Sequence, residues 1–210
     1  MRERTWRLVL AGLLMSACGN PVSVPELASD SVAKEEALID RARGIHDRVL
    51  TIDSHDDISF DFATPEVDPG VRGGRQVDLV KMVEGGLDAA FFVVYVGQTE
   101  RTPENYAQAQ ADAMTKFDAI HRMAEEMYPD LIEIAYTAAD FERIAADGKL
   151  VAAIGIENGY VIGTDLALLE TYHELGARYI TLAHNGHNDI ADSANPRENL
   201  GDADAEHDGV

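Results

Sequence analysis

Four side chains that could bind a metal ion each follow an apolar run of the sequence. His55 and Asp57 stand two residues apart, so in an extended chain both side chains point to the same side. Glu157 and His184 follow two later apolar runs. An imidazole and a carboxylate on one face form half of a metal site. These residues therefore predict a metal centre, provided that the fold brings the runs together.

Each of these segments also has a simpler interpretation. His55 and Asp57 could be two polar residues of an exposed loop, and His184 could be a solvated loop histidine. Glu157 could cap a helix or pair with an arginine. A function is favoured for Glu157, because burying a carboxylate without a partner costs more than a strand gains. A functional role is favoured for all four residues if the three strand ends that carry them meet at one edge of a sheet.

The elements that must position these residues alternate along the chain. Apolar runs predict strands near residues 49–53, 87–96, 132–136, 151–156 and 178–183. Helical spacing and capping residues predict helices at residues 31–46 and 77–86, from Pro103 onward, at 137–148 and at 165–175. This alternation predicts an α/β protein with a mostly parallel sheet. In such folds the chemistry gathers at the carboxyl ends of the strands.

The composition is that of one globular domain with an acidic surface. The chain has 210 residues, of which 46% are hydrophobic. Asp and Glu number 38 against 17 Lys and Arg, a net charge of -21. Such a charge repels a phosphate backbone, so we expect no nucleic-acid partner. The single cysteine, Cys18, excludes an internal disulfide and a cysteine-cluster zinc site.

The N-terminal residues predict export. Arginines at positions 2, 4 and 7 precede a short apolar run, which is typical of a signal peptide over residues 1–18 and too short for a membrane span. Residues 14–18 resemble a bacterial lipobox, which makes Cys18 the expected lipid attachment site; a plain signal peptide is the alternative. Residues 19–30 are expected to form a flexible tether. The predicted location is the bacterial cell envelope, lipid-anchored or periplasmic.

Several segments together resemble one known family. In order and with matching spacing, residues 52–57 (IDSHDD), 76–79 (QVDL), 84–96 (EGGLDAAFFVVYV), 154–159 (IGIENG) and 175–185 (LGARYITLAHN) are similar to the membrane dipeptidase (renal dipeptidase) family. The resemblance covers about residue 31 to the end of the chain. It implies a (β/α)₈ TIM-barrel metallopeptidase that hydrolyses dipeptides through a metal-bridging hydroxide.

The resemblance also implies roles for individual residues and a cofactor. His55 and Asp57 would bind one zinc ion, and Glu157 would bridge two zinc ions. His184 would contact the substrate. From its position beside the first ligand pair, Asp53 is expected to support that pair without binding the metal itself. The family resemblance also suggests a homodimer.

One departure from the family pattern concerns the later strands. The family takes the second zinc ion's two histidines from strands beyond those found here, and residues 195–210 form only a polar acidic stretch. Residues 31–210 are therefore expected to be the N-terminal part of an incomplete barrel, about its first half, and the chain to be a truncated and inactive form.

Two other classes of function stay open. The chain could be a non-catalytic, lipid-anchored module that binds a peptide or a metal ion. It could also be a related amide or lactam hydrolase of the amidohydrolase type. Asp57 speaks against that second alternative, because those enzymes usually carry His-x-His at this strand end.

Overall fold

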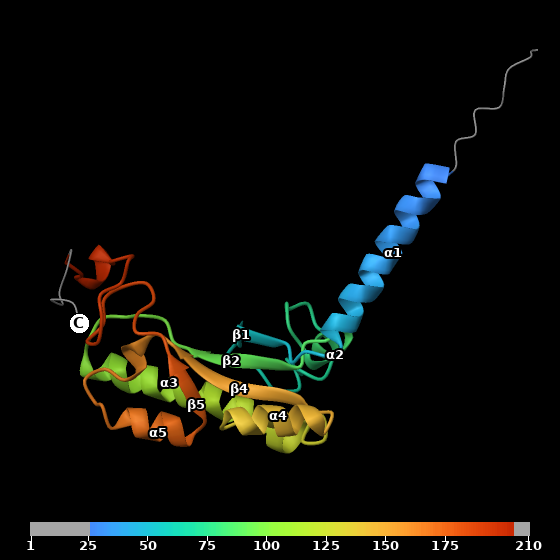
Figure 1. Ribbon diagram of the computed structural model, residues 1–210. Coiled ribbons are helices and arrows are strands. Elements are labelled where there is room, and N and C mark those ends of the chain that lie inside the picture. Colours follow the sequence, from blue (N-terminus) through green and yellow to red (C-terminus); the bar gives the residue numbers. More distant parts are fainter. Residues whose placement is uncertain (1–25, 204–210) are drawn as a thin grey trace, which may run out of the picture. The chain divides into compact units, whose positions relative to one another are not determined.

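The computed structural model describes residues 26–203, with side chains from residue 31 onward (Figure 1). The predicted signal peptide, Cys18 and the first part of the predicted tether lie outside the described residues. The chain divides into two compact units, residues 1–44 and 45–210.

The described part of the first unit is helical. Helix α1 (Glu26–His46) begins five residues earlier than expected, so residues 26–30 of the predicted flexible tether are helix instead. The segment Glu-Leu-Ala-Ser-Asp contains neither glycine nor proline, and Glu, Leu and Ala are strong helix formers, which accounts for the difference. Among the described helices, none combines the length and the apolar character that crossing a membrane requires.

The second unit is built on a parallel sheet of five strands. These are β1 (Ile52–Asp57), β2 (Ala89–Tyr95), β3 (Ile132–Ile134), β4 (Leu150–Glu157) and β5 (Ala177–Ile180). β2 lies between β1 and β4, while β3 and β5 share the other edge of β4, β3 at its start and β5 near its end. The strands β1, β2, β4 and β5 thus follow one another in chain order, as strands in the wall of a (β/α)₈ barrel do. The predicted α/β class and the extra short strand near residue 132 are confirmed.

The helices begin and end where the sequence supplies caps. Asp78 caps α2 (Leu79–Gly85), and Gly86 ends it with a φ of 68°. Thr102 caps α3 (Pro103–His121), which continues as a π-helical segment to Met127. Thr137 caps α4 (Ala138–Ala146). Helix α5 (Leu168–Glu174) begins three residues later than predicted, because residues 162–168 form successive turns.

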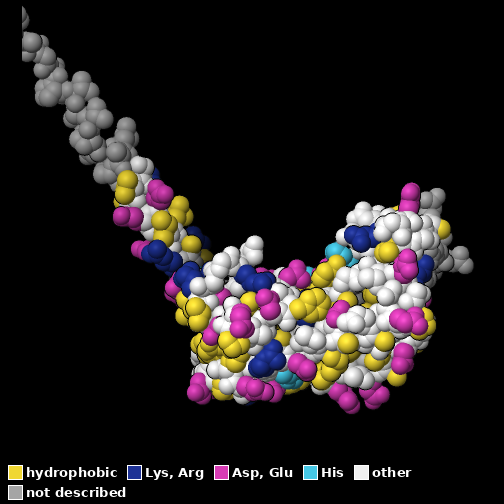
Figure 2. All heavy atoms as spheres, turned by 180° about the vertical axis from the view of Figure 1, so that it is seen from behind, with side chains coloured by type: hydrophobic (Ala, Val, Ile, Leu, Met, Phe, Trp, Pro, Cys, Tyr) yellow, Lys and Arg dark blue, Asp and Glu magenta, His cyan; other side chains and the backbone are white. Residues whose placement is uncertain are grey.

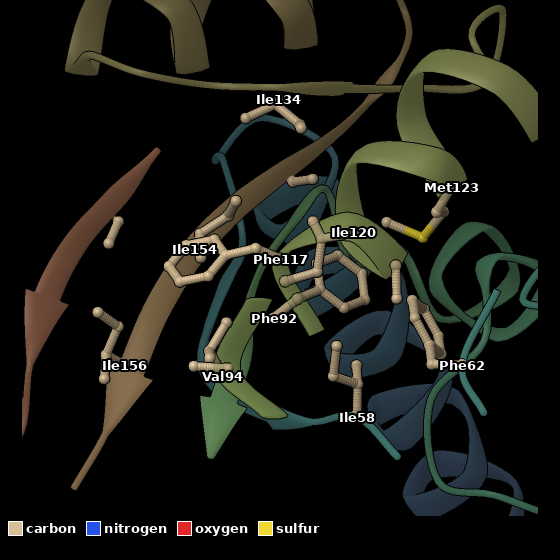
Figure 3. Packing of buried hydrophobic residues seen from close by; sticks show 14 of the residues in the cluster. Ile58, Phe62, Phe92, Val94, Phe117, Ile120, Met123, Ile134, Ile154 and Ile156 are labelled. Atoms are coloured by element: carbon tan, nitrogen blue, oxygen red, sulfur yellow. The ribbon is translucent and has the colours of Figure 1, made fainter. Parts of the chain in front are cut away.

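The main core lies between one face of the sheet and helices α2, α3 and α5 (Figure 3). Alternate residues of β2 and β4 point into it, among them Phe92 and Ile154, and Phe117 of α3 packs against them. On the opposite face, α4 packs over the amino ends of β2 and β4 through Ile144, which lies with Ala89 and Val151. The carboxyl ends of the strands on that face are left to the polar residues of the site.

The first strand differs from the expectation. It was predicted as a buried strand near residues 49–53, but β1 begins at Ile52, and Val49, Leu50 and Ile52 are exposed. The turn that ends α1 occupies residues 45–49, and β1 lies at the end of the strand order, with β2 as its neighbour.

The face seen in Figure 2 carries acidic side chains with exposed hydrophobic ones between them.

The C-terminal stretch also contains structure that was not expected. Residues Glu198–Leu200 form a 3-10 turn. The Asp202 carboxylate accepts hydrogen bonds from the backbone N–H groups of His187 and Arg197, at 2.9 and 2.6 Å. The described part of this stretch therefore packs on the loop that follows β5.

Candidate metal centre

The chemistry-bearing residues meet at the carboxyl ends of three parallel strands. His55 and Asp57 end β1, and Glu157 is the last residue of β4. His184 lies in the loop four residues after β5. Between Asp53 and Asp56, β1 carries an irregularity in its pairing with β2. Such bulges re-aim side chains next to functional sites.

A group of three side chains could hold a metal ion. His55 Nε2 lies 3.3 Å from Glu157 Oε2 and 4.0 Å from Asp57 Oδ1. One ligand atom from each of the three residues lies within 4.8 Å of the others. One imidazole nitrogen and two carboxylate oxygens are donors that zinc takes in proteins, so the residues present fit a divalent metal ion.

Tyr179 orients the ring of His55. The Tyr179 hydroxyl donates to the carbonyl oxygen of Ser54 at 3.1 Å, and its oxygen lies 3.1 Å from His55 Nδ1. With its one proton directed to Ser54, the hydroxyl oxygen is left to accept a hydrogen bond from Nδ1 in the Nδ1–H tautomer. That tautomer leaves Nε2 available to a metal ion. A partner on the second ring nitrogen is the usual arrangement for a metal-binding histidine.

Tyr95 plays a similar part on the other side of Glu157. His184 Nε2 lies 3.5 Å from Glu157 Oε1, and His184 Nδ1 lies 3.3 Å from the Tyr95 hydroxyl. Tyr95 is aligned with Glu157 in the pairing of β2 with β4. The two oxygens of Glu157 thus face different histidines, and each histidine has a tyrosine at its Nδ1.

Both tyrosines are kept protonated by their surroundings. Burial, with the charges of Glu157, Asp57 and Asp53 adding to it, raises the pKa of Tyr179 to about 12. Burial raises the pKa of Tyr95, and the nearby Glu157 charge raises it further. At neutral pH both hydroxyls therefore keep their protons and their hydrogen bonds.

The two aspartates beside the ligands, Asp53 and Asp56, differ in their surroundings. Asp53 Oδ1 accepts the backbone N–H of His55 at 3.0 Å, so Asp53 supports the irregular segment of β1. Asp56 is partly buried. This burial, together with the charges of Asp53 and Asp57, raises the pKa of Asp56 to about 7.

One cation reaches towards the site from the helix side. The buried Lys116 of α3 donates to the carbonyl oxygen of Ile58 at 2.7 Å, one residue beyond Asp57. Its ammonium lies 5.0 Å from the centre of the Phe60 ring. Burial lowers the pKa of Lys116, while the charges of Asp57 and Glu157 oppose that effect. Lys116 thus ties α3 to the segment that follows the first ligand pair.

The structure brings the predicted residues His55, Asp57, Glu157 and His184 together, with Asp53 beside them; their chemical roles stay predictions. His187, three residues after His184, is buried elsewhere in the loop, where its Nδ1 accepts the backbone N–H of Ser193 at 3.0 Å.

The reasoning from sequence missed Tyr95 and Tyr179. A signal was present for both. Each tyrosine is a polar-tipped residue in an apolar strand, and in β2 the period of two places Tyr95 on the face opposite Phe92 and Val94.

The chain was compared with known proteins. A family model described as membrane dipeptidase (Peptidase family M19) matches residues 39–210. The dipeptidase aclJ of Aspergillus oryzae is 35% identical over 127 residues, which are 59% of this chain and 30% of aclJ. The dipeptidase ataJ of Aspergillus terreus is 30% identical over 164 residues, which are 73% of this chain and 40% of ataJ.

Two solved structures resemble the fold of this chain. The probable dipeptidase PvdM of Pseudomonas aeruginosa matches with a TM-score of 0.74 and 28% identity, over 80% of this chain and 43% of PvdM. A metallo peptidase of Rhodobacter sphaeroides, liganded with a phosphinate mimic of the dipeptide L-Ala-D-Ala, shares the fold with a TM-score of 0.55 and 23% identity. The latter match covers 66% of this chain and 48% of that protein. The chain thus spans less than half the length of each of these four relatives.

Proposed function

The chain belongs to the membrane dipeptidase family, and from that membership we propose that its site serves the zinc-dependent hydrolysis of dipeptides. The observation that carries the proposal is the arrangement around Glu157, with His55 at one carboxylate oxygen, His184 at the other and Asp57 close to His55. The dipeptide substrate and the zinc ion belong to the proposal.

The ligand residues are prepared for a cation before it binds. In the Nδ1–H tautomer, whose Nδ1 hydrogen bonds to the Tyr179 hydroxyl oxygen, His55 would present a free Nε2 to the ion. Asp57 and Glu157 supply carboxylate oxygens on the same side. When bound there, zinc would polarise the scissile carbonyl and lower the pKa of water to near neutrality.

The remaining residues act on the substrate and on each other. We assign His184 to the carbonyl oxygen of the scissile bond, where a donated hydrogen bond strengthens as negative charge develops. Tyr95 holds the His184 ring through Nδ1. Glu157, whose second oxygen faces the first ligand pair, keeps His184 at a set distance from the metal ligands.

The test is a zinc titration of the purified chain, followed by assays with dipeptides. The described residues contain one group that could hold a metal ion, so we expect one bound zinc per chain. The zinc-loaded chain should bind the phosphinate mimic of L-Ala-D-Ala, and the dipeptide assays test the expectation that the chain is inactive. Glu157→Gln should lower the zinc affinity at least about 10-fold, since it removes a charged ligand. Glu170→Gln, on the exposed face of α5, is the matched control.

Two results would refute the proposal. One is zinc binding that Glu157→Gln leaves unchanged. The other is a zinc-loaded chain that does not bind the mimic. A panel that includes β-lactams and other amides separates dipeptide hydrolysis from a broader hydrolase activity.

We also propose that the protein is exported to the bacterial cell envelope and carries a lipid at Cys18, as residues 1–18 indicate. In a bacterial host, the wild-type protein should fractionate with membranes and Cys18→Ser should not. Sedimentation of the purified protein tests the homodimer that the family resemblance suggests.

A further inference from the structure

We propose that Asn158 and Asn188 are positioning residues that set the distance between Glu157 and His184. This inference deepens the proposed function and rests on it, because it assigns the residues that hold half of the proposed site in place. Both asparagines are completely buried.

Asn158 uses the full hydrogen-bonding capacity of its side chain. Its Nδ2 donates to the carbonyl oxygen of Val96 at 3.2 Å and to Gln98 Oε1 at 3.3 Å. Its Oδ1 accepts from Asn188 Nδ2 at 3.1 Å and from the backbone N–H of Tyr160 at 3.3 Å. A primary amide has two donor hydrogens and two acceptor lone pairs, so no capacity is left over.

Asn188 is satisfied in the same way. Its Nδ2 donates to Asn158 Oδ1 and, at 2.7 Å, to the carbonyl oxygen of Leu182. Its Oδ1 accepts the backbone N–H groups of Ile190 and Ala191, at 2.8 and 3.0 Å. Buried polar groups that are fully paired make a local arrangement rigid and unique.

The ends of this network are next to the site residues. Val96 follows Tyr95, and Asn158 follows Glu157. Leu182 stands two residues before His184. The asparagine pair thus links the carboxyl ends of β2 and β4 to the loop after β5, next to the residues of each that contribute a side chain to the site. Shifting one member of the pair must shift Glu157 relative to His184.

The backbone of Asn158 gives independent support. Its φ is 80° and its ψ is 106°, a conformation that non-glycine residues rarely adopt. Such strain persists only where surrounding contacts impose it, and it concentrates at functional sites. Here the side-chain hydrogen bonds of Asn158, together with that of its backbone N–H to Thr181 Oγ1 at 3.0 Å, impose it directly after Glu157.

The central variant for the test is Asn158→Gly. Glycine accepts a positive φ without strain, so the substitution relieves the backbone while deleting the side-chain network. Asn188→Asp is the second variant: it keeps the two acceptor bonds of the turn and loses both donor bonds. Asn199→Gly makes the same chemical change as the first variant at an exposed position and serves as the control.

The first measurement is the NMR signal of the His184 ring in the metal-free full chain, with the exposed His173 as internal reference. We expect Asn158→Gly and Asn188→Asp to displace the His184 signals and leave those of His173 in place. The second measurement is zinc affinity, which should fall about 10-fold because Glu157 is no longer held. Asn199→Gly should match the wild type in both.

The inference is overturned if folded Asn158→Gly or Asn188→Asp keeps the His184 signals and the zinc affinity of the wild type. If the wild-type chain binds neither zinc nor the phosphinate mimic of L-Ala-D-Ala, the proposed function fails. The His184 comparison in the metal-free protein then still decides whether the asparagines position the ring.

Discussion

Gly155→Ala should damage the metal centre without touching any ligand. Gly155 lies in β4, and the Tyr179 ring lies over it. A Cβ at position 155 would stand 2.2 Å from Tyr179 Cζ and 2.5 Å from both Cε1 and Oη. Gly155 is not among the described residues with a positive φ, so the alanine backbone itself is unstrained. The effect of the substitution is therefore a displacement of Tyr179.

The size of the effect follows from these distances. Carbon atoms pack at about 3.5–4.0 Å, so the ring must move by more than about 1 Å. That movement breaks the 3.1 Å contacts of the Tyr179 hydroxyl with His55 Nδ1 and with the Ser54 carbonyl oxygen. Loss of the group that orients a metal-binding histidine typically lowers metal affinity about 10- to 100-fold. Overpacking should also lower the free energy of unfolding by about 1–3 kcal/mol.

Competition titration with a chromogenic chelator measures the zinc affinity, and urea denaturation measures the stability. Gly85→Ala is the matched control, because no atom lies within 4 Å of a Cβ at that position. Tyr179→Phe removes the hydroxyl and keeps the ring, so it should lose zinc affinity to a similar extent with less loss of stability. Unchanged zinc affinity in both Gly155→Ala and Tyr179→Phe would refute the role given to Tyr179.

Three further changes test the electrostatics, the core and a helix cap. The pKa of Asp56 is raised to about 7, so its favourable contribution to stability is complete below about pH 4 and is lost as the pH rises through 7. In EDTA, the free energy of unfolding of Asp56→Asn should therefore rise relative to that of the wild type by about 1–2 kcal/mol from pH 4 to pH 8, after allowance for solvent screening. Urea denaturation at the two pH values measures this difference, and a difference that does not change with pH would contradict the prediction. Phe117→Ala empties a fully buried position and should lower the free energy of unfolding by about 3–5 kcal/mol; a loss below about 1 kcal/mol would mean that the core in Figure 3 packs differently. Thr137→Ala removes the cap of α4, whose Oγ1 accepts the Asp140 N–H at 3.2 Å, and should cost about 1 kcal/mol in thermal denaturation, whereas a stability equal to that of the wild type would rule out this cap.

The order of strands and helices could be predicted from the sequence because it depends on local patterns. Apolar runs, caps such as Thr137 and the terminating Gly86 act within a few residues of themselves, and they placed most elements within about three residues. The exposure of β1 could not be predicted in this way. The apolar run near residue 50 predicts a buried strand, but the strand order places β1 at one end of the sheet, where these residues are exposed.

The candidate site divides in the same manner. His55, Asp57, Glu157 and His184 could be selected from the sequence, because residue type and position after an apolar run are local properties. Their tertiary contacts could not be predicted, because they join residues that are about 24 to 62 positions apart in the sequence. These contacts are the alignment of Tyr95 with Glu157, the packing of Tyr179 over Gly155 and the pairing of Asn158 with Asn188. The sequence by itself determined which groups are available for chemistry. Only the tertiary structure decided which side chains position the candidate site residues, because hydrogen bonds and packing act over a few ångströms in space whatever the separation in the sequence.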